Sequence, residues 1–285
     1  MKISMEKKAD LMLFVTAIGW ALSTILIKLY MSGMPVFHVV FGRYIIAFLL
    51  MGFIWRKKFK NIKKSELISG SILSIFLFFA FTFAISSLTY TSASKSGFFV
   101  AMSVLFVPIV SGVVKKRLPN KWVVMSVLIS IIGLYLVAGI NGDSFNRGDV
   151  LALLCAVAYT VYILLMDRYA KNIDTSHLVL IQLGMVTIIS FLAMVALEGF
   201  EPQVLLDQAI PIILTGVFGT AITSLAQTKA QQHASPESVG LILLGEPLFT
   251  LIMAAAILNE TILIKGLMGA GLLLMAMVIT VLKDV

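Results

Sequence analysis

Long apolar segments separated by short polar ones run along almost the whole chain. Each is about 20 residues long, and a helix of about 20 mainly apolar residues spans a lipid bilayer. The pattern therefore predicts ten transmembrane helices joined by short connections, which makes an all-α membrane protein. The expected spans are residues 11–30, 37–55, 67–88, 93–114, 122–140, 149–167, 177–197, 209–230, 236–258 and 265–282.

The two halves of this pattern repeat one another. The segment DLMLFVTAIGW at residue 10 aligns with DVLALLCAVAY at residue 149, an offset of 139 that pairs Trp20 with Tyr159. A second alignment, at an offset of 143, places Gly97 over Gly240. These matches predict two domains of five spans each, residues 9–140 and 148–283.

An odd number of spans per half fixes how the halves are related. Because five spans end on the side opposite to their start, the second half must run inverted relative to the first. Inverted repeats are typical of secondary transporters, whose binding site lies near the bilayer midplane between the repeats. Two such halves would rock about a central cavity and open it alternately to each side.

Composition and charge agree with a membrane location. The chain of 285 residues is 60% hydrophobic and only 13% charged, whereas soluble domains are about 25% charged. With ten spans, 17 of the 22 Lys and Arg residues fall on one side, which predicts that both termini are cytoplasmic. We expect a multi-pass protein of the cytoplasmic membrane, with the basic run RKKFKNIKK at 56–64 near lipid headgroups rather than on nucleic acid.

Several classes of chemistry lack their sequence signature. Cys155 is the only cysteine, and His38, His177 and His233 lie far apart near span ends, so no disulfide or metal site is expected. The sequence contains no phosphate-binding loop, so the chain is not by itself an ATP-driven pump. We expect no cofactor, and a carrier rather than an enzyme.

The most informative residues are Glu246 and Pro247, in the middle of the ninth span. A carboxylate at the bilayer midplane costs roughly 2.5–3.5 kcal/mol and usually marks a functional site. Pro247 has no N–H, which should kink the helix and leave the Leu243 carbonyl without its helical bond. Glu246 is therefore a candidate for exchanging a proton or a cationic group in a cavity. The alternative is a structural carboxylate that stabilises the kink.

Six further polar or aromatic residues within the spans are candidates for the transport pathway. They are Arg43, Lys95, Gln182, Gln227, Trp20 and Tyr159. Arg43 could bind a carboxylate or extend to the membrane surface, and Lys95 could be solvated or could pair with an acid at an outer gate. The two glutamines could hydrogen-bond a substrate or join helices, and the two rings could line a cavity or pack in the core.

Three stretches resemble the EamA-type family of the drug/metabolite transporter superfamily. They are SLTYTSASKSGFF, LFVPIVSGVVKKRLP and ASPESVGLILLGEPLFTLIMAAAILNET. The family pattern of Glu-Pro followed by an acidic residue is met in the second half by Glu246, Pro247 and Glu260. In the first half Ser103 and Val104 stand in the Glu-Pro positions, so a buried carboxylate occurs on one side only.

The resemblance implies a carrier of a small organic metabolite such as an amino acid, a nucleoside or an organic cation. It also implies export, and substrate binding between the first, third, fourth, sixth, eighth and ninth spans. Transport would follow the substrate gradient or use protons exchanged at Glu246. An alternative is a flippase for an amphipathic or lipid-linked substrate, which basic groups such as Arg43 and Lys95 would suit. The partners we expect are the substrate and membrane lipid, with the protein acting as a monomer or homodimer.

Overall fold

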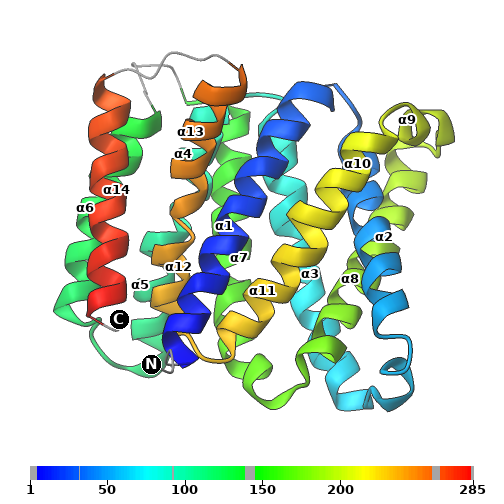
Figure 1. The fold of residues 1–285 in the computed structure, drawn as a ribbon, viewed down its shortest axis with the longest axis horizontal. Coiled ribbons are helices and arrows are strands. Elements are labelled where there is room, and N and C mark those ends of the chain that lie inside the picture. Colours follow the sequence, from blue (N-terminus) through cyan, green and yellow to red (C-terminus); the bar gives the residue numbers. More distant parts are fainter. Residues whose placement is uncertain (1–4, 32, 92, 139–144, 259–263, 284–285) are drawn as a thin grey trace.

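The computed structural model describes residues 5–31, 33–91, 93–138, 145–258 and 264–283, and these residues form helices without any strand (Figure 1). The α-helices are α1 (Met5–Tyr30), α2 (Val36–Ile54), α3 (Lys64–Ser87), α4 (Ala93–Val100), α5 (Ser103–Lys115), α6 (Lys121–Ala138), α7 (Arg147–Tyr169), α8 (Thr175–Ala193), α9 (Pro202–Asp207), α10 (Ala209–Gly216), α11 (Ile222–Gln231), α12 (Pro236–Ile242), α13 (Gly245–Leu258) and α14 (Ile264–Leu282).

The prediction of ten spans is confirmed. Ten helical segments of the described chain are long and apolar enough to cross a membrane. The first of them begins at Met5 rather than at residue 11, because the charged residues before the apolar run continue the same helix. Three spans consist of two helices each: α4 with α5, α10 with α11, and α12 with α13.

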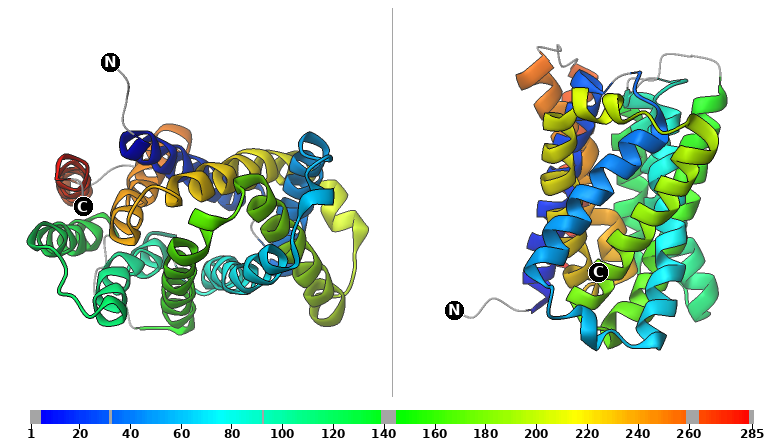
Figure 2. Two further views of the ribbon diagram at one scale, coloured as in Figure 1. Left: turned by 90° about the horizontal axis from the view of Figure 1, so that it is seen from below. Right: turned by 90° about the vertical axis from the view of Figure 1, so that its right-hand side faces the viewer.

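Seen end-on, the helices form two layers (Figure 2). One layer contains α1, α10, α11 and α2, and the other contains α7, α3 and α8, while α6 and α14 pair at one end of the molecule (Figures 1 and 2). Glycines allow the closest helix contacts: a Cβ on Gly269 would lie 2.6 Å from the Gly133 carbonyl oxygen of α6. Such small residues let membrane helices approach without side chains between them.

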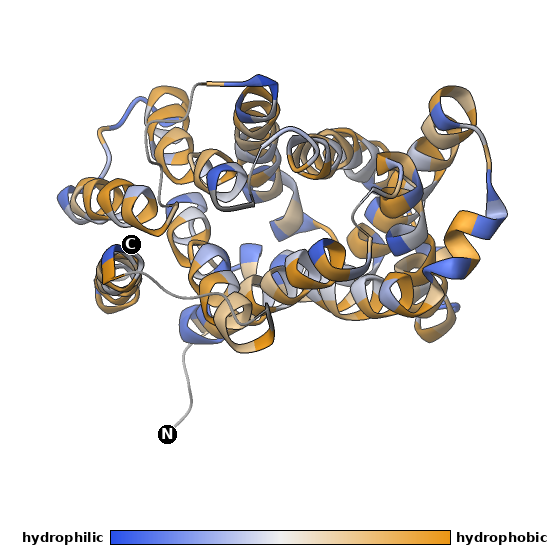
Figure 3. Ribbon diagram, turned by 90° about the horizontal axis from the view of Figure 1, so that it is seen from above, coloured by the Kyte–Doolittle hydropathy of each residue, from blue (hydrophilic) through white to orange (hydrophobic). Residues whose placement is uncertain are grey.

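The outside of the bundle is apolar. Many large side chains are exposed on it, among them Phe53, Leu128, Ile132, Leu192 and Leu274, and Figure 3 shows hydrophobic residues around the helices with hydrophilic ones mainly at helix ends and in loops. An exposed apolar surface of this extent suits lipid rather than water. We call the end where α1 begins and α14 ends the terminal face, and the opposite end the distal face (Figure 1).

The fourth and ninth spans are both interrupted halfway through the bundle. The break between α12 and α13 falls at Leu243 and Leu244, just before Glu246. The break between α4 and α5 falls at residues 101–102, where there is no proline, and Pro108 lies inside α5. The kink was expected in the second half only. The expectation of an unpaired Leu243 carbonyl was wrong, since it accepts the Glu246 N–H at 3.0 Å.

Candidate functional site

A cavity of about 210 Å³ lies beside both helix breaks. Its lining comes from α1, α2, α3, α4, α5, α6, α7, α12 and α13 and from the residues at the breaks. The lining stops at Ser103 and Gly240 toward the terminal face, and it extends to Lys28 and Leu88 at the distal face. The cavity thus occupies the middle and distal parts of the bundle.

The helices around the cavity agree in part with those implied by the family resemblance. The first, third, fourth, sixth and ninth spans contribute lining residues, as expected. The eighth span does not, and the second and fifth spans do. The reason is that α10 and α11 lie behind Arg43 and Tyr159, which reach the cavity from α2 and α7.

Glu246 lines this cavity from the first turn of α13. Its side chain is partly exposed there, hydrogen-bonds Thr24 of α1 and is attracted by the positive charge of Arg43. A negative charge at a helix N-terminus is favourable, because the first N–H groups of a helix have no partners inside it. Glu246 makes no ion pair within 4.0 Å among the described residues.

Arg43 also lines the cavity but is only 3% exposed. Its Nε donates to the Thr220 hydroxyl at 3.2 Å and its Nη2 to the Gly219 carbonyl at 3.0 Å. Both acceptors belong to a π-helical turn, Val217–Ala221, between α10 and α11, and such turns often occur at functional sites. The guanidinium therefore points into the bundle, and the alternative in which it extends to the membrane surface is wrong for this conformation.

Three aromatic rings form one wall of the cavity. Trp20 contacts Tyr159 with ring centroids 5.6 Å apart and Phe81 at 5.9 Å, both edge-on. The Arg43 guanidinium lies over the Phe81 ring, 5.4 Å from its centroid. Trp20 and Tyr159, which the repeat pairs in sequence, therefore meet in space at the centre of the molecule.

Neither candidate glutamine lines the cavity. Gln227 is buried in α11 and donates to the Tyr159 hydroxyl at 2.6 Å and to Gln231 at 3.2 Å. Gln182 is buried in α8 and accepts from the Tyr162 hydroxyl at 2.9 Å. Gln227 thus holds a cavity ring in position from behind, and Gln182 joins two helices.

Lys95 is a further departure from the expected pathway residues. It is 5% exposed, and its Nζ lies 2.8 Å from Oδ2 of Asp149, which is fully buried at the start of α7. Of the two alternatives for Lys95, the solvated or headgroup-bound charge is therefore wrong, and the structure shows a pair with an acidic group. The pair connects α4 of the first half to α7 of the second near the distal face. Lys95 does not line the cavity, although the next residue, Ser96, does.

Sequence reasoning missed Thr24, Phe81 and Cys155, all of which line the cavity. Thr24 and Phe81 carry no signal of their own, since apolar spans contain many such residues. Cys155 could have been found because it lies one helical turn before Tyr159 and therefore on the same face of the helix. Glu260 lies outside the described residues, and those residues contain no group of three His, Cys, Asp or Glu side chains that could hold a metal ion.

Comparison with known proteins gives consistent results. The sequence model of the EamA-like transporter family matches residues 7–139 and again residues 146–282. Two proteins of Archaeoglobus fulgidus, each named an uncharacterized transporter, are 28% identical to the chain. One alignment covers 96% of this chain and 86% of the relative, and the other 90% and 91%.

More distant relatives show the same pattern. A Bacillus subtilis protein named uncharacterized transporter YxxF is 22% identical over 78% of this chain and 73% of its own length. One solved crystal structure shares the fold, with a TM-score of 0.79 over 98% of both chains at 16% identity.

Proposed function

Because the chain belongs to the EamA-like transporter family, we propose that it is a secondary transporter that carries a small organic metabolite across the cytoplasmic membrane by alternating access. The candidate substrates are amino acids, nucleosides and organic cations. The direction we propose is export, which rests on the family resemblance, and the proposed driving force is the exchange of protons at Glu246.

The observation that supports this proposal is the position of Glu246. Its carboxylate lines a cavity at the break of a membrane helix, within the attraction of Arg43, and the same cavity is lined by three aromatic rings. Irregular backbone at this depth is tolerated where protein or a cavity surrounds it, and transporters place their sites at such broken helices. A carboxylate there can hold a proton in one state and release it in another.

The size and lining of the cavity support a small substrate with an apolar part. Pockets for drug-sized ligands usually measure about 300–1,000 Å³, and this cavity is smaller, at about 210 Å³. Most of its wall is made of aliphatic and aromatic side chains, with a few polar groups at Glu246, Arg43 and Thr24. Such a lining suits a substrate with one charged or polar group and a compact apolar body.

The flippase alternative is less well supported. It needed basic groups available to a headgroup, and Lys95 pairs with Asp149 while Arg43 is bonded to the π-helical turn of the eighth span. Neither cation is exposed at the lipid surface. The buried cavity is therefore better explained by a small metabolite.

The test is proton-coupled flux in liposomes. Candidate amino acids, nucleosides and quaternary amines are first screened by thermal shift, and a gradient of the stabilising compound is then applied while a pH dye reports the lumen. We expect a pH change with the wild-type protein and with Glu6→Gln, which alters an exposed carboxylate outside the cavity. Glu246→Gln should abolish the pH change. An equal pH change in Glu246→Gln would refute proton exchange at this residue.

A further inference from the structure

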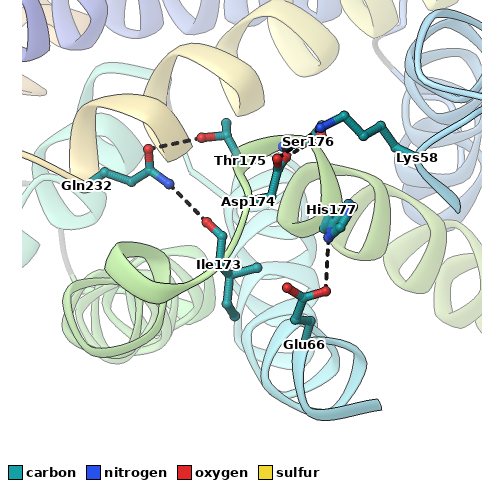
Figure 4. Close-up of polar contacts among 8 residues, drawn as sticks. All are labelled: Lys58, Glu66, Ile173, Asp174, Thr175, Ser176, His177 and Gln232. Carbon is teal, nitrogen blue, oxygen red and sulfur yellow. Dashed lines mark hydrogen bonds and ion pairs between the residues drawn. The ribbon is translucent and has the colours of Figure 1, made fainter. Parts of the chain in front are cut away.

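Two histidine–carboxylate contacts join the halves at opposite faces of the membrane. At the distal face, His38 Nδ1 lies 2.9 Å from Oε2 of Glu198. At the terminal face, His177 Nδ1 lies 2.9 Å from Oε2 of Glu66 (Figure 4). We refer to these two contacts as the distal clasp and the terminal clasp.

The histidines of the two clasps are related by the internal repeat. His38 is the third residue of α2 and His177 the third residue of α8, and they are separated by 139 residues, the offset that also pairs Trp20 with Tyr159. Each histidine reaches into the other half: His38 to Glu198, the last residue of the seventh span, and His177 to Glu66, in the first turn of α3. The repeat relates the histidines but not the carboxylates, because Glu66 and Glu198 lie 132 residues apart.

Each clasp also satisfies backbone groups at a helix start. Glu198 accepts the N–H groups of Phe37 at 2.9 Å and His38 at 3.2 Å, and thereby caps α2 from the other half. Glu66 accepts the N–H of Lys63 at 2.9 Å, at the start of its own helix α3. Opening the distal clasp would leave two backbone donors without a partner, which is costly where water is scarce.

The rings themselves are buried and oriented. His38 is 1% and His177 is 7% exposed. Because a carboxylate can only accept, Nδ1 of each ring donates. Nε2 of His38 accepts the Glu201 N–H at 3.4 Å, while Nε2 of His177 has no partner among the described residues. In both clasps the hydrogen bond to the carboxylate thus fixes the orientation of the histidine ring.

A second polar group holds the start of α8 at the terminal face (Figure 4). Asp174 caps the helix by accepting from Ser176, and its other oxygen lies 3.0 Å from Nζ of Lys58, in the connection between α2 and α3. The hydrogen bond from the Ser176 side chain, followed by the bond from Lys58, lowers the pKa of Asp174 below its usual range. Gln232, after α11, donates to the carbonyl of Ile173 at 3.1 Å.

The clasps lie away from the cavity. Helix α8 contributes no residue to the cavity lining, and α2 contributes only Arg43. Between the clasps α2 and α8 pack closely, since a Cβ on Gly184 would lie 3.0 Å from the Phe48 ring. The contact on the terminal side of the cavity involves neither α2 nor α8. There α5 packs against α12, and the Ser111 hydroxyl donates a hydrogen bond to the Glu237 carboxylate.

We propose that both clasps stay closed in every conformation, so that α2, the start of α3 and α8 form one fixed body to which both halves contribute. The halves then do not rock as two separate units. The cavity changes its opening through the broken spans, α4 with α5 and α12 with α13, and the contact between Ser111 and Glu237 opens and closes. This inference rests on the proposed alternating access and adds to it which helices move.

The test uses Cys155, the only cysteine, which lines the cavity. A membrane-impermeant thiol reagent is applied from one or the other face of sealed vesicles, and the ratio of the two labelling rates reports how often the cavity opens to each face. A contact present in both conformations does not affect this ratio, whereas one present in a single conformation does. The thermal stability of each variant is measured in parallel.

The variants are His38→Leu and His177→Leu, which remove the donors, and His38→Asn and His177→Asn, which keep a donor near Nδ1. We expect the leucine variants to lower the melting temperature, the asparagine variants to restore most of it, and all four to leave the labelling ratio within about twofold of wild type. The matched control is Ser111→Ala, which should raise labelling from the terminal face several-fold.

Three results would overturn the proposal. A shift of about tenfold or more in the ratio for either leucine variant would mean that the clasp exists in one conformation only. If a leucine variant does not fold, the same shift in Glu198→Gln or Glu66→Gln decides the question. Labelling of the wild-type protein from one face alone would refute alternating access, and the clasp proposal with it.

Discussion

Breaking the buried pair between Lys95 and Asp149 should be among the most damaging single changes outside the cavity. The two side chains are 6% and 0% exposed, and their charged atoms are 2.8 Å apart. Asp149 has two further partners, the Thr91 hydroxyl at 3.1 Å and the Asn146 N–H at 2.8 Å. The change Lys95→Met therefore leaves a carboxylate charge buried with neutral donors only.

The expected cost follows from this geometry. Two unit charges 2.8 Å apart attract by roughly 6 kcal/mol at an effective dielectric constant of about 20, and the loss of water around both charges offsets most of that attraction. Removing one partner leaves the other charge without compensation and costs about 3–5 kcal/mol. The double change Lys95→Met with Asp149→Asn buries no charge and keeps an acceptor for Thr91 and Asn146. It should cost at least about 2 kcal/mol less than the two single changes added together.

The assay is unfolding in detergent, followed by heat and by titration with a denaturing detergent, for the four members of this cycle. The matched control is Lys115→Met, because Lys115 is 47% exposed and lies 3.6 Å from Asp167. An exposed pair of this kind contributes about 0–1 kcal/mol. If the two single changes at the buried pair were additive, or if Lys95→Met cost no more than Lys115→Met, the reasoning from burial would be refuted.

Three further changes test the packing, the cavity wall and the helix cap. Gly19→Ala places a Cβ 2.4 Å from a methyl group of α11, so it should destabilise by about 1–3 kcal/mol. Gly271→Ala, with nothing within 4 Å, should not lower the melting temperature, because Ala favours a helix more than Gly does. Gln227→Leu leaves the Tyr159 hydroxyl without its partner, so the substrate concentration for half-maximal flux should rise about tenfold, and unchanged flux kinetics would contradict the positioning role. Asp174→Ala removes a helix cap and should cost about 1 kcal/mol at neutral pH. Because the folded pKa of Asp174 is lowered, its contribution is complete above its unfolded pKa of about 4 and disappears as the pH falls through the folded pKa. The stability difference from wild type should therefore narrow in acid and stay constant above pH 5.

The membrane fold could be predicted from the sequence because the bilayer imposes a length on every span. Nine of the ten expected spans begin within about three residues of the helical segments seen in the structure, as Arg147 for residue 149 and Lys121 for residue 122 illustrate. The exception, at Met5, arose because hydropathy marks where lipid begins and not where a helix begins. Charged residues in water can continue a helix that the apolar pattern no longer requires.

The cavity residues were only partly predictable, for a different reason. Glu246, Arg43, Trp20 and Tyr159 stand out as polar or aromatic groups deep in apolar spans, and the structure places all four around one cavity. A position along a span does not say which way a side chain points around the helix axis. Gln227 is equally deep in its span, yet it faces Tyr159 from behind.

Whether a charged side chain is buried and paired likewise depends on residues from other spans. For Lys95 the sequence leaves open a solvated charge or a pair with an acid, because its position at the start of a span gives no information about Asp149, more than 50 residues later in the sequence. The clasps were more accessible to sequence reasoning. The offset of 139 relates His38 to His177 directly, and a polar residue that recurs at the repeat offset in an apolar chain indicates a contact used twice.

The helix breaks show most clearly what local sequence does not determine. In the ninth span Pro247 follows the break, and a proline at this place disrupts the helical hydrogen bonding. In the fourth span the break occurs at the corresponding place, at residues 101–102, with no proline there, while Pro108 lies within the regular helix α5. Proline is therefore not required for the break. What the two sites share is their position beside the central cavity, where backbone groups can be satisfied without a regular helix, as in the bond from the Leu105 N–H to the Met102 carbonyl at 2.9 Å. The break is thus a property of the repeated architecture. Its two copies differ in the residue beside the cavity, Glu246 in one half and Ser103 in the other, and we propose that this difference gives the site its chemistry.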